Sequence, residues 1–300
     1  MTHPPMHADE MLTDEALVRR LLASQFPRWA GLGIARVPSA GTDNALYRLG
    51  PDMIVRLPRI HWAVDAVAKE QRWLPRLAPH LPVAIPSPLA VGPPGEGYPW
   101  PWSIYRWLDG ENPAVGSLSD PAALTADLAS FVAALHRIDP SHGPYAERGG
   151  PLGERDADTR TAIAELEGTV DTGAVTAAWE GALGIAPWTQ PAVWIHGDLA
   201  PGNLLCRHGR LHAVIDFGCV GVGDPAVDML IAWTLLPANV RETYRAALGV
   251  DRDTWLRGRG WALSIALIQL PYYRRSNPEL AARARHVIRE VLADVEAGGG

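Results

Sequence analysis

The stretch His196-Gly197-Asp198-Leu199-Ala200-Pro201-Gly202-Asn203, followed by Ile215-Asp216-Phe217-Gly218, decides how the rest of this chain is interpreted. Mostly apolar residues lead into both segments, at 192–195 and 211–215. Such short apolar runs are typical of buried strands. Each polar cluster is therefore predicted to follow the end of a strand, where side chains commonly form functional sites.

The polar residues of the two segments suit phosphoryl transfer. Pro201 and Gly202 exclude a helix between Asp198 and Asn203, so one loop presents a carboxylate and an amide to the same space. Asp216 supplies a second carboxylate. Two oxygen-bearing groups for Mg²⁺ and one carboxylate for a substrate hydroxyl are what a kinase requires.

Composition indicates a globular protein. The 300 residues are 47% hydrophobic, enough for one large or two modest domains. A net charge of −6 without a basic run argues against binding to nucleic acid or to an anionic membrane. Residues 1–7 do not resemble a secretory signal, and no segment is apolar enough to span a membrane. Cys206 and Cys219 are predicted to be ordinary buried thiols, and we expect a cytoplasmic protein.

The first third of the chain predicts a small antiparallel sheet with helices. A helix capped by Thr13 is expected to end near Phe26, where Pro27 follows. Short β-like runs follow at 34–37, 45–49 and 53–57, and the residues between the first two form a small polar loop.

The next segments lead toward a second domain. The pattern of 64–77 predicts a helix that Pro75 bends or ends early. Residues 82–88, which contain three prolines, and the proline- and glycine-rich residues 91–101 are interpreted as extended loops. A strand at 102–108 is expected to cross between two domains, 1–107 and 108–300.

The remaining chain is predicted to be mainly helical. A helix at 124–138 is expected to be capped by Ser119 or Asp120. Further helices are predicted at 228–236, 241–248, 254–270 and 280–295. The acidic stretch 154–180 has two interpretations: a wall for a cationic substrate or, as we favour, a solvated helix face.

These motifs resemble the aminoglycoside phosphotransferase family, relatives of protein kinases. The resemblance rests on the two opening segments, on Gly223-Asp224-Pro225 with Asp228, and on 134–140, and it covers about 33–295. It implies an α+β, protein-kinase-like fold, with a small nucleotide-binding lobe of antiparallel sheet plus helix (1–107) and a larger, mainly helical catalytic and acceptor-binding lobe (108–300).

The resemblance also implies roles for the motif residues. Asp198 orients or deprotonates the acceptor hydroxyl, and Asn203 and Asp216 hold Mg²⁺ on the nucleotide phosphates. His196 is expected to brace the loop rather than to take part in the chemistry. We expect Asp224 and Asp228 to anchor the loop by hydrogen bonds to its backbone, and His136 to be a satisfied core histidine.

The nucleotide site is expected to draw on the polar loop, the third strand, the following helix and the strand between the lobes. The candidates are Ser39, Gly41, Thr42, Asn44, Arg56, Glu70, Tyr105, Arg106 and Leu108. Arg56 stands where kinases usually carry a lysine for the α- and β-phosphates, and Glu70 is expected to hold it in place. Lys69 is a weaker alternative, and Arg59 remains a competitor.

The phosphate donor is ATP or GTP. Backbone groups of Arg106 and Leu108 are expected to meet the base, with Tyr105 behind them. In the family that the chain resembles, a large residue there can obstruct the deeper adenine pocket. Tyr105 therefore favours the hypothesis that GTP is used.

The acceptor is predicted to be a small hydroxylated molecule. Ala200 replaces the lysine of protein kinases, and the few residues between Gly218 and Gly223 leave no room for a peptide platform. The stretch 269–278 is expected to interrupt the last helices, so its Tyr272, Tyr273 and Asn277 are candidates for the acceptor site. A simple helix connection packed by the tyrosines is an equal alternative.

Three functions remain open. The first is an O-phosphotransferase acting on an aminoglycoside or another hydroxylated antibiotic, such as a macrolide or nucleoside. The second is a metabolic kinase for a sugar, an amino alcohol or a homoserine-like acceptor. The third is a nucleotide-binding protein without transfer activity. In each case we expect a monomer or homodimer.

Overall fold

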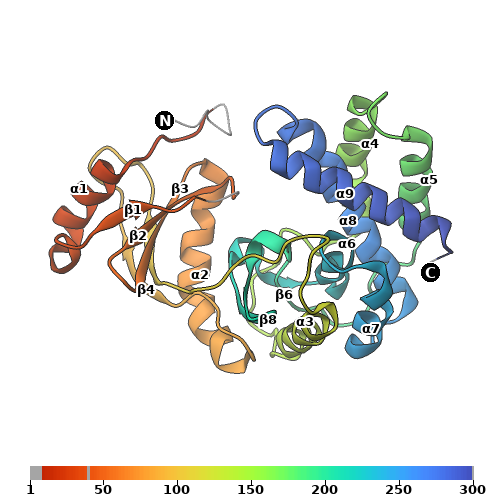
Figure 1. Ribbon diagram of the computed structural model, residues 1–300, viewed down its shortest axis with the longest axis horizontal. Helices are drawn as coiled ribbons and strands as arrows, with labels where there is room; N and C mark the ends of the chain where they lie inside the picture. Colours follow the sequence, from red (N-terminus) through yellow and green to blue (C-terminus); the bar gives the residue numbers. More distant parts are fainter. Residues whose placement is uncertain (1–8, 39–40, 299–300) are drawn as a thin grey trace. The chain divides into compact units, whose positions relative to one another are not determined.

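The computed structural model describes residues 9–38 and 41–298, which form two compact units (Figure 1). The first unit combines Met1–Pro79, Ala84–Gly110 and Ala213–Gly218. The second combines His80–Val83, Glu111–His212 and Cys219–Gly300. Asp216 thus belongs to the first unit, although the chain on both sides of its segment belongs to the second. Lobes with the limits 1–107 and 108–300 stay our proposal for the functional division.

A five-stranded antiparallel sheet forms the centre of the first unit, in the order β1-β2-β3-β5-β4. Its strands are β1 (Ile34–Arg36), β2 (Asn44–Leu49), β3 (Met53–Pro58), β4 (Pro88–Gly92) and β5 (Trp102–Arg106). Their residues alternate between two faces of the sheet, because successive side chains of a strand point in opposite directions. This alternation separates an apolar face from a face that carries polar side chains.

Helix α1 (Glu15–Gln25) packs on the apolar face (Figure 1). Its Leu21 and Leu22 are fully buried with Tyr47 of β2 and Val55 of β3. Burial of each such aliphatic side chain contributes about 1.5–3 kcal/mol. Helix α2 (Val64–Leu77) covers the opposite face. The sheet and its two helices therefore fix the polar side chains that point toward α2.

Two local predictions in this unit were wrong, and Pro75 does not end the predicted helix early. Asp14, not Thr13, caps α1 and accepts a hydrogen bond from the Leu17 N–H at 2.7 Å. The proline-rich stretch predicted as loop forms β4, which lies at the edge of the sheet, where a proline removes no ladder hydrogen bond. Helix α2 continues through Pro75 to Leu77.

Five shorter α-helices and two longer ones make up most of the described second unit. The shorter ones are α3 (Pro121–His136), α4 (Asp156–Glu165), α5 (Thr172–Leu183), α6 (Ile231–Thr234) and α7 (Ala238–Leu248), with a 3₁₀ helix η7 (Pro225–Leu230) before α6. The longer ones are α8 (Arg252–Tyr273) and α9 (Pro278–Glu296). Asp120, one of the two expected residues, caps α3.

Two short ladders of the second half of the chain hold the motif loops. Strand β6 (Val193–Ile195) pairs with β9 (Gly221–Gly223), and β7 (Leu204–Arg207) pairs with β8 (Arg210–Val214). The segment from His196 to Asn203 connects β6 to β7, and Asp216 follows β8. Both motif loops therefore begin at strand ends, as the apolar runs predicted.

The α+β, kinase-like class is confirmed by the antiparallel sheet and the mainly helical second unit. Most helices begin or end a few residues from their predicted limits, and the helix predicted at 228–236 is divided into η7 and α6. Helix α8 continues through Pro271 to Tyr273, so the expected interruption at 269–278 is reduced to the residues after Tyr273. No disulfide joins Cys206 and Cys219. Among the described residues, no helix is both long and apolar enough to cross a membrane.

Candidate functional site

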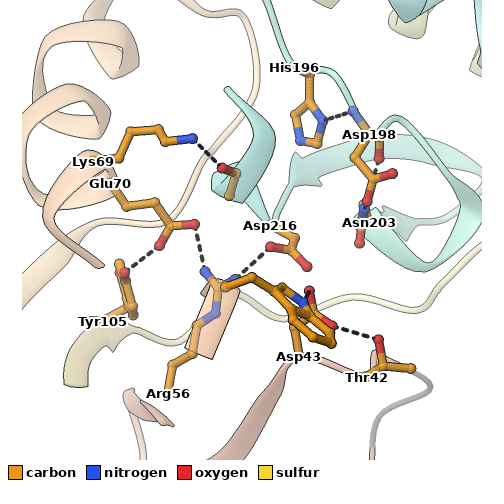
Figure 2. Close-up of polar contacts among 12 residues, drawn as sticks. Thr42, Asp43, Arg56, Lys69, Glu70, Tyr105, His196, Asp198, Asn203 and Asp216 are labelled. Atoms are coloured by element: carbon orange, nitrogen blue, oxygen red, sulfur yellow. Dashed lines mark hydrogen bonds and ion pairs between the residues drawn. The ribbon is translucent and has the colours of Figure 1, made fainter. Parts of the chain in front are cut away.

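The polar face of the first unit's sheet centres on Arg56. Its guanidinium contacts the carboxylates of Glu70 and Asp216, each at 2.6 Å (Figure 2). Burial by itself lowers the pKa of Arg56, but the two carboxylates outweigh burial and raise this pKa well above its ordinary value. Arg56 is therefore a permanent cation, and only 14% of its side chain is exposed.

Glu70 has this position because it lies on the buried stripe of α2. Val67 and Leu74 precede and follow it at helical spacing and are buried with it. A carboxylate with 1% exposure requires a partner, and Glu70 has two, Arg56 and the hydroxyl of Tyr105 (Figure 2). The expected ion pair between Arg56 and Glu70 is thus present.

Tyr105 on β5 supports Glu70 from the sheet. Its side chain is buried, and burial followed by the nearby Glu70 charge raises the pKa of the phenol. The hydroxyl therefore stays protonated and donates its hydrogen bond to Glu70. The same contact that holds Glu70 fixes the position of the bulky ring behind the end of β5.

Asp216 adopts a left-handed backbone conformation, with φ of +63°. Aspartate tolerates this region better than most residues, but the conformation is sparsely populated and persists where neighbouring contacts impose it. One such contact is close by, because Lys69 donates a hydrogen bond to the Gly218 carbonyl oxygen at 2.7 Å (Figure 2). Lys69 thus ties α2 to the segment that carries Asp216.

The polar loop before β2 contributes a further contact with Arg56. When the amide oxygen of Asn44 faces the guanidinium, it accepts hydrogen bonds from Arg56 Nη2 at 2.9 Å and Nε at 3.1 Å. Thr42 donates its hydroxyl hydrogen to Asp43 at 2.9 Å. Gly41 begins the described part of this loop, whereas Ser39, another candidate, lies outside the described residues.

The competing arginine has another partner. Arg59 is buried and pairs with Glu10 at 3.1 Å, and the Arg59 backbone N–H donates to the Asp43 carbonyl oxygen at 2.7 Å. The geometry therefore favours Arg56 over Arg59 as the residue that faces α2 and Asp216.

Asp198 in the second unit is held from two sides. Asn203 Nδ2 donates to the Asp198 backbone carbonyl oxygen at 2.8 Å and to carboxylate Oδ2 at 3.1 Å. The Arg148 guanidinium binds the other carboxylate oxygen, Oδ1. A third of the Asp198 side chain remains exposed, so the carboxylate is oriented and still accessible.

The loop that carries Asp198 is fixed by buried Asp228. The two carboxylate oxygens of Asp228 accept hydrogen bonds from the backbone N–H groups of His196 at 3.1 Å and Gly197 at 2.9 Å. His136 Nε2 also contacts Asp228 at 3.1 Å, so this histidine is satisfied, as predicted. His196 is fully buried, and its Nδ1 accepts from the Asp198 N–H at 3.2 Å, which matches a bracing role (Figure 2).

Asp224 is placed differently from the expectation. Its carboxylate pairs with buried Arg257, with contacts of 2.7 and 3.2 Å, and caps η7 through the Ala226 N–H at 2.9 Å. These side-chain contacts involve no backbone group of the loop that carries Asp198. Asp224 therefore supports the site by holding η7, the helix that carries Asp228.

Arg148 was not among the predicted residues. The sequence contains one signal for it: a single arginine followed by Gly149-Gly150, shortly after the 134–140 motif. Without the fold, however, nothing in that stretch connects it to Asp198. The connection depends on how residues 144–149 run beside β9.

The backbone of β5 ends where the nucleotide base was expected. The Arg106 N–H donates to the Ser87 carbonyl oxygen at 2.9 Å, and the Trp107 N–H donates to the Asp52 carbonyl oxygen at 2.8 Å. The Arg106 N–H is therefore already hydrogen-bonded within the protein. Leu108 directly follows this paired region and is half-buried.

The acceptor candidates lie where α8 ends and α9 begins. The rings of Tyr272 and Tyr273 pack edge to face with their centroids 4.8 Å apart. Asn277 is buried and caps α9 through the Leu280 N–H at 3.1 Å. This cap alone explains Asn277, and a role of the three residues toward an acceptor stays a prediction.

Carboxylates of the acidic stretch have structural partners. Asp156 accepts hydrogen bonds from Arg160 and Trp179, each at 2.8 Å, and Asp171 caps α5. Glu180 pairs with the same Arg160 at 3.4 Å. These contacts agree with the helix-face interpretation.

Comparisons with solved structures place the fold among antibiotic phosphotransferases. A GDP and kanamycin complex of APH(2")-IIia is 20% identical, with a TM-score of 0.76, and the match covers 92% of this chain and 98% of that chain. ADP-bound aminoglycoside phosphotransferase APH(2'')-Ib is 17% identical, with a TM-score of 0.62 and coverage of 93% and 98%. Macrolide 2'-phosphotransferase MphH from Brachybacterium faecium is 24% identical, with a TM-score of 0.61 and coverage of 92% and 97%.

The sequence comparisons give the family. The search of curated proteins gives no match. A family model described as "Phosphotransferase enzyme family" matches residues 34–261, which is more than half of the chain. This match confirms the predicted resemblance and the predicted class of enzyme. The chain belongs to the phosphotransferase enzyme family.

Proposed function

We propose that this phosphotransferase transfers the γ-phosphate of a nucleoside triphosphate to a hydroxyl group of an antibiotic. The antibiotic is an aminoglycoside or another hydroxylated compound such as a macrolide or nucleoside. The observation that carries the proposal is the Asp198 carboxylate, which Arg148 and Asn203 orient while a third of the side chain stays exposed. An oriented, accessible carboxylate suits the deprotonation of a hydroxyl group.

The proposed reaction is an in-line displacement. The acceptor oxygen forms a bond to the γ-phosphorus, and the bond from this phosphorus to the β–γ bridging oxygen breaks. The nucleoside diphosphate leaves with the bond electrons, and the hydroxyl proton moves to Asp198. Because little covalent chemistry falls to the protein, orientation and charge stabilisation supply most of the rate enhancement.

The first unit supplies the proposed nucleotide site. Arg56 binds the α- and β-phosphates, and Glu70 with Tyr105 keeps its guanidinium in place. Gly41 and Thr42 of the described loop and Asn44 at the start of β2 line the phosphates.

The base meets the end of β5. The sheet already uses the Arg106 N–H, so we assign the Arg106 carbonyl and the Leu108 N–H to the base.

Mg²⁺ is the proposed metal, with Asn203 and Asp216 as its ligands. Among the described residues, no cluster of three or more His, Cys, Asp or Glu is arranged to hold a metal. That fits Mg²⁺ on a nucleotide, which takes one or two protein oxygens and completes its shell with phosphates and water. Asn203 uses Nδ2 for Asp198, so Oδ1 is its atom for a metal. Bound Mg²⁺ would neutralise phosphate charge.

Relatives with the same fold support the acceptor and donor classes. The solved structures include complexes of aminoglycoside enzymes with kanamycin and with gentamicin, as well as macrolide phosphotransferases. Their nucleotides include GDP, ADP and ATP. Both ATP and GTP therefore belong in the assay.

A screen of nucleotide consumption tests the proposal. Kanamycin, gentamicin, streptomycin, a macrolide, a nucleoside antibiotic, a sugar, an amino alcohol and homoserine are each incubated with Mg²⁺ and ATP or GTP. We expect at least one antibiotic to be phosphorylated by the wild type, and more slowly by about two to four orders of magnitude in Asp198→Asn. Turnover with metabolites alone would indicate a metabolic kinase, and nucleotide binding without any turnover would indicate a binding protein. Protection of a susceptible host separates resistance from metabolism.

A further inference from the structure

The ion pair between Arg148 and Asp198 is the strongest feature outside the predicted residues. Arg148 Nη1 binds Asp198 Oδ1 and lies 3.4 Å from the Gly197 carbonyl oxygen. Asn203 binds the other carboxylate oxygen at 3.1 Å. One side chain on each oxygen leaves the carboxylate a single orientation.

The backbone around Arg148 is built to hold it there. The Ala146 N–H donates to the Val222 carbonyl oxygen at 3.1 Å, which attaches the segment to β9. On the other side of Arg148, the Gly149 carbonyl oxygen accepts from the Asp224 N–H at 2.8 Å. Two backbone contacts therefore bracket the arginine on the ladder that leads into the Asp198 loop.

Gly149 is the residue that allows this close approach. Its φ of +112° lies in a region that residues with a side chain rarely adopt. A Cβ at this position would lie 2.5 Å from Ile195 Cδ1, at the end of β6. The segment can thus lie against β6 and β9 only because the residue after Arg148 is glycine.

Stability does not account for the pair. The Arg148 side chain is 27% exposed and that of Asp198 is 33% exposed, and ion pairs with this access to solvent stabilise a fold only slightly. The structure shows another partly exposed pair outside the motif segments, Arg210 with Asp127 at 2.5 Å. That pair provides a matched control.

We propose that Arg148 is a positioning residue that holds the Asp198 carboxylate in its reactive orientation. The inference rests on the proposed function, because it assigns to Asp198 the acceptance of the hydroxyl proton. Arg148 contacts Oδ1 and Asn203 contacts Oδ2, so neither side chain alone fixes the rotation of the carboxylate. Without Arg148, the carboxylate turns about its last bond, and fewer encounters with the hydroxyl are productive.

Steady-state kinetics test the proposal with Arg148→Gln, Arg148→Lys and the control Arg210→Gln. Arg148→Gln is expected to lower kcat on the order of 10- to 100-fold and to leave the KM for the nucleotide unchanged, since small misplacements of a reacting group have effects of that size. Arg148→Lys should restore part of the loss, and Arg210→Gln should resemble the wild type. An unchanged kcat in Arg148→Gln, or a raised one as expected for a blocking contact, overturns the proposal.

A double-mutant cycle distinguishes positioning from a general structural effect. In the Asp198→Asn background, Arg148→Gln should cause no further loss of kcat, because the carboxylate that Arg148 orients is already gone. Two losses that multiply would show that Arg148 acts independently of Asp198 and would contradict the proposal.

Crystal structures of Arg148→Gln and Arg210→Gln keep the inference testable even if no acceptor is found. The Asp198 carboxylate should rotate away from its Asn203 contact, or occupy two orientations, in the first variant only. An unchanged carboxylate in Arg148→Gln would overturn the positioning role. By contrast, a wild type that transfers phosphate to no acceptor would refute the proposed function, whatever the crystals show.

Discussion

Arg56 and Asp198 carry the two central charges of the proposed site, and the protein holds them in different ways. Arg56 lies on a strand, is 14% exposed and pairs with Glu70, which is 1% exposed. Asp198 lies on a loop, is 33% exposed and is bound by side chains from another loop and from its own. Arg56 is thus part of the buried interior of its unit, whereas the Asp198 carboxylate is partly exposed to solvent.

Because Arg56 and Asp198 differ in burial, mutations at the two residues should have different effects. A buried ion pair is costly to break, because the remaining charge stays in a medium where water cannot solvate it. When the partner of a partly exposed carboxylate is removed, the fold loses little stability, since water replaces the contact. Mutations of Arg56 should therefore lower stability and nucleotide binding together, whereas mutations of Asp198 and of its partner Arg148 should lower turnover alone.

The largest expected effect follows Asp198→Asn. The amide cannot accept the hydroxyl proton, so kcat should decrease by about two to four orders of magnitude, the usual contribution of a positioned base. Nucleotide affinity, measured by calorimetry, should stay near that of the wild type, because Arg56 and its partners are untouched. A nearly normal rate would show that Asp198 is not the base.

Removing the cation of the first unit should act on folding as well as on function. Arg56→Ala leaves the buried Glu70 carboxylate without its cation, so unfolding should become easier by about 3–5 kcal/mol. Nucleotide binding and transfer should weaken together. Chemical denaturation and calorimetric titration with ATP and GTP measure the two effects.

Arg59→Ala is the matched control for that change. Arg59 is also a buried arginine paired with a glutamate, Glu10, at 3.1 Å. Its loss should therefore destabilise the protein similarly and leave the nucleotide affinity of the folded enzyme unchanged. If Arg59→Ala abolishes nucleotide binding and Arg56→Ala does not, the phosphate ligand is Arg59.

A smaller loss is expected when the anchor of the Asp198 loop is weakened. Asp228→Asn can keep only one acceptor oxygen for the N–H groups of His196 and Gly197, so stability should decrease by about 1–3 kcal/mol. Turnover should decrease as well, because the loop shifts. Asp224→Asn is the comparison: its side chain contacts Arg257 and η7, so it should cost stability with less change in kcat per folded enzyme.

The same contrast explains what the sequence could predict. The strand of Arg56 and the helix of Glu70 were predictable because periods of 2 and 3.6 residues place both side chains on inward faces. The loop motifs were identified from short-range spacing. Arg148 was not predicted, because its contact with Asp198 spans 50 positions and depends on backbone pairing beside β9.

Other errors have similarly local causes. Thr13 was predicted to cap α1, whereas the chain enters the helix one residue later and Asp14 is the cap. Prolines in the stretch of β4 and within α2 and α8 suggested interruptions. The prolines of β4 are accommodated because β4 is an edge strand, whereas α2 and α8 continue through Pro75 and Pro271 and end two residues later.

The smallest expected effect concerns the choice of phosphate donor, ATP or GTP. Tyr105 has two proposed roles: its hydroxyl contacts Glu70, and its bulky ring lies behind the base. Tyr105→Ala removes both, whereas Tyr105→Phe removes only the hydroxyl that binds Glu70. If the ring favours guanine, the ratio of kcat/KM for ATP to that for GTP should rise on the order of 10-fold in Tyr105→Ala. The ratio should change little in Tyr105→Phe. A wild type that strongly prefers ATP at equal concentrations would refute the steric role of Tyr105, and an equal change in both variants would assign the preference to Glu70 instead.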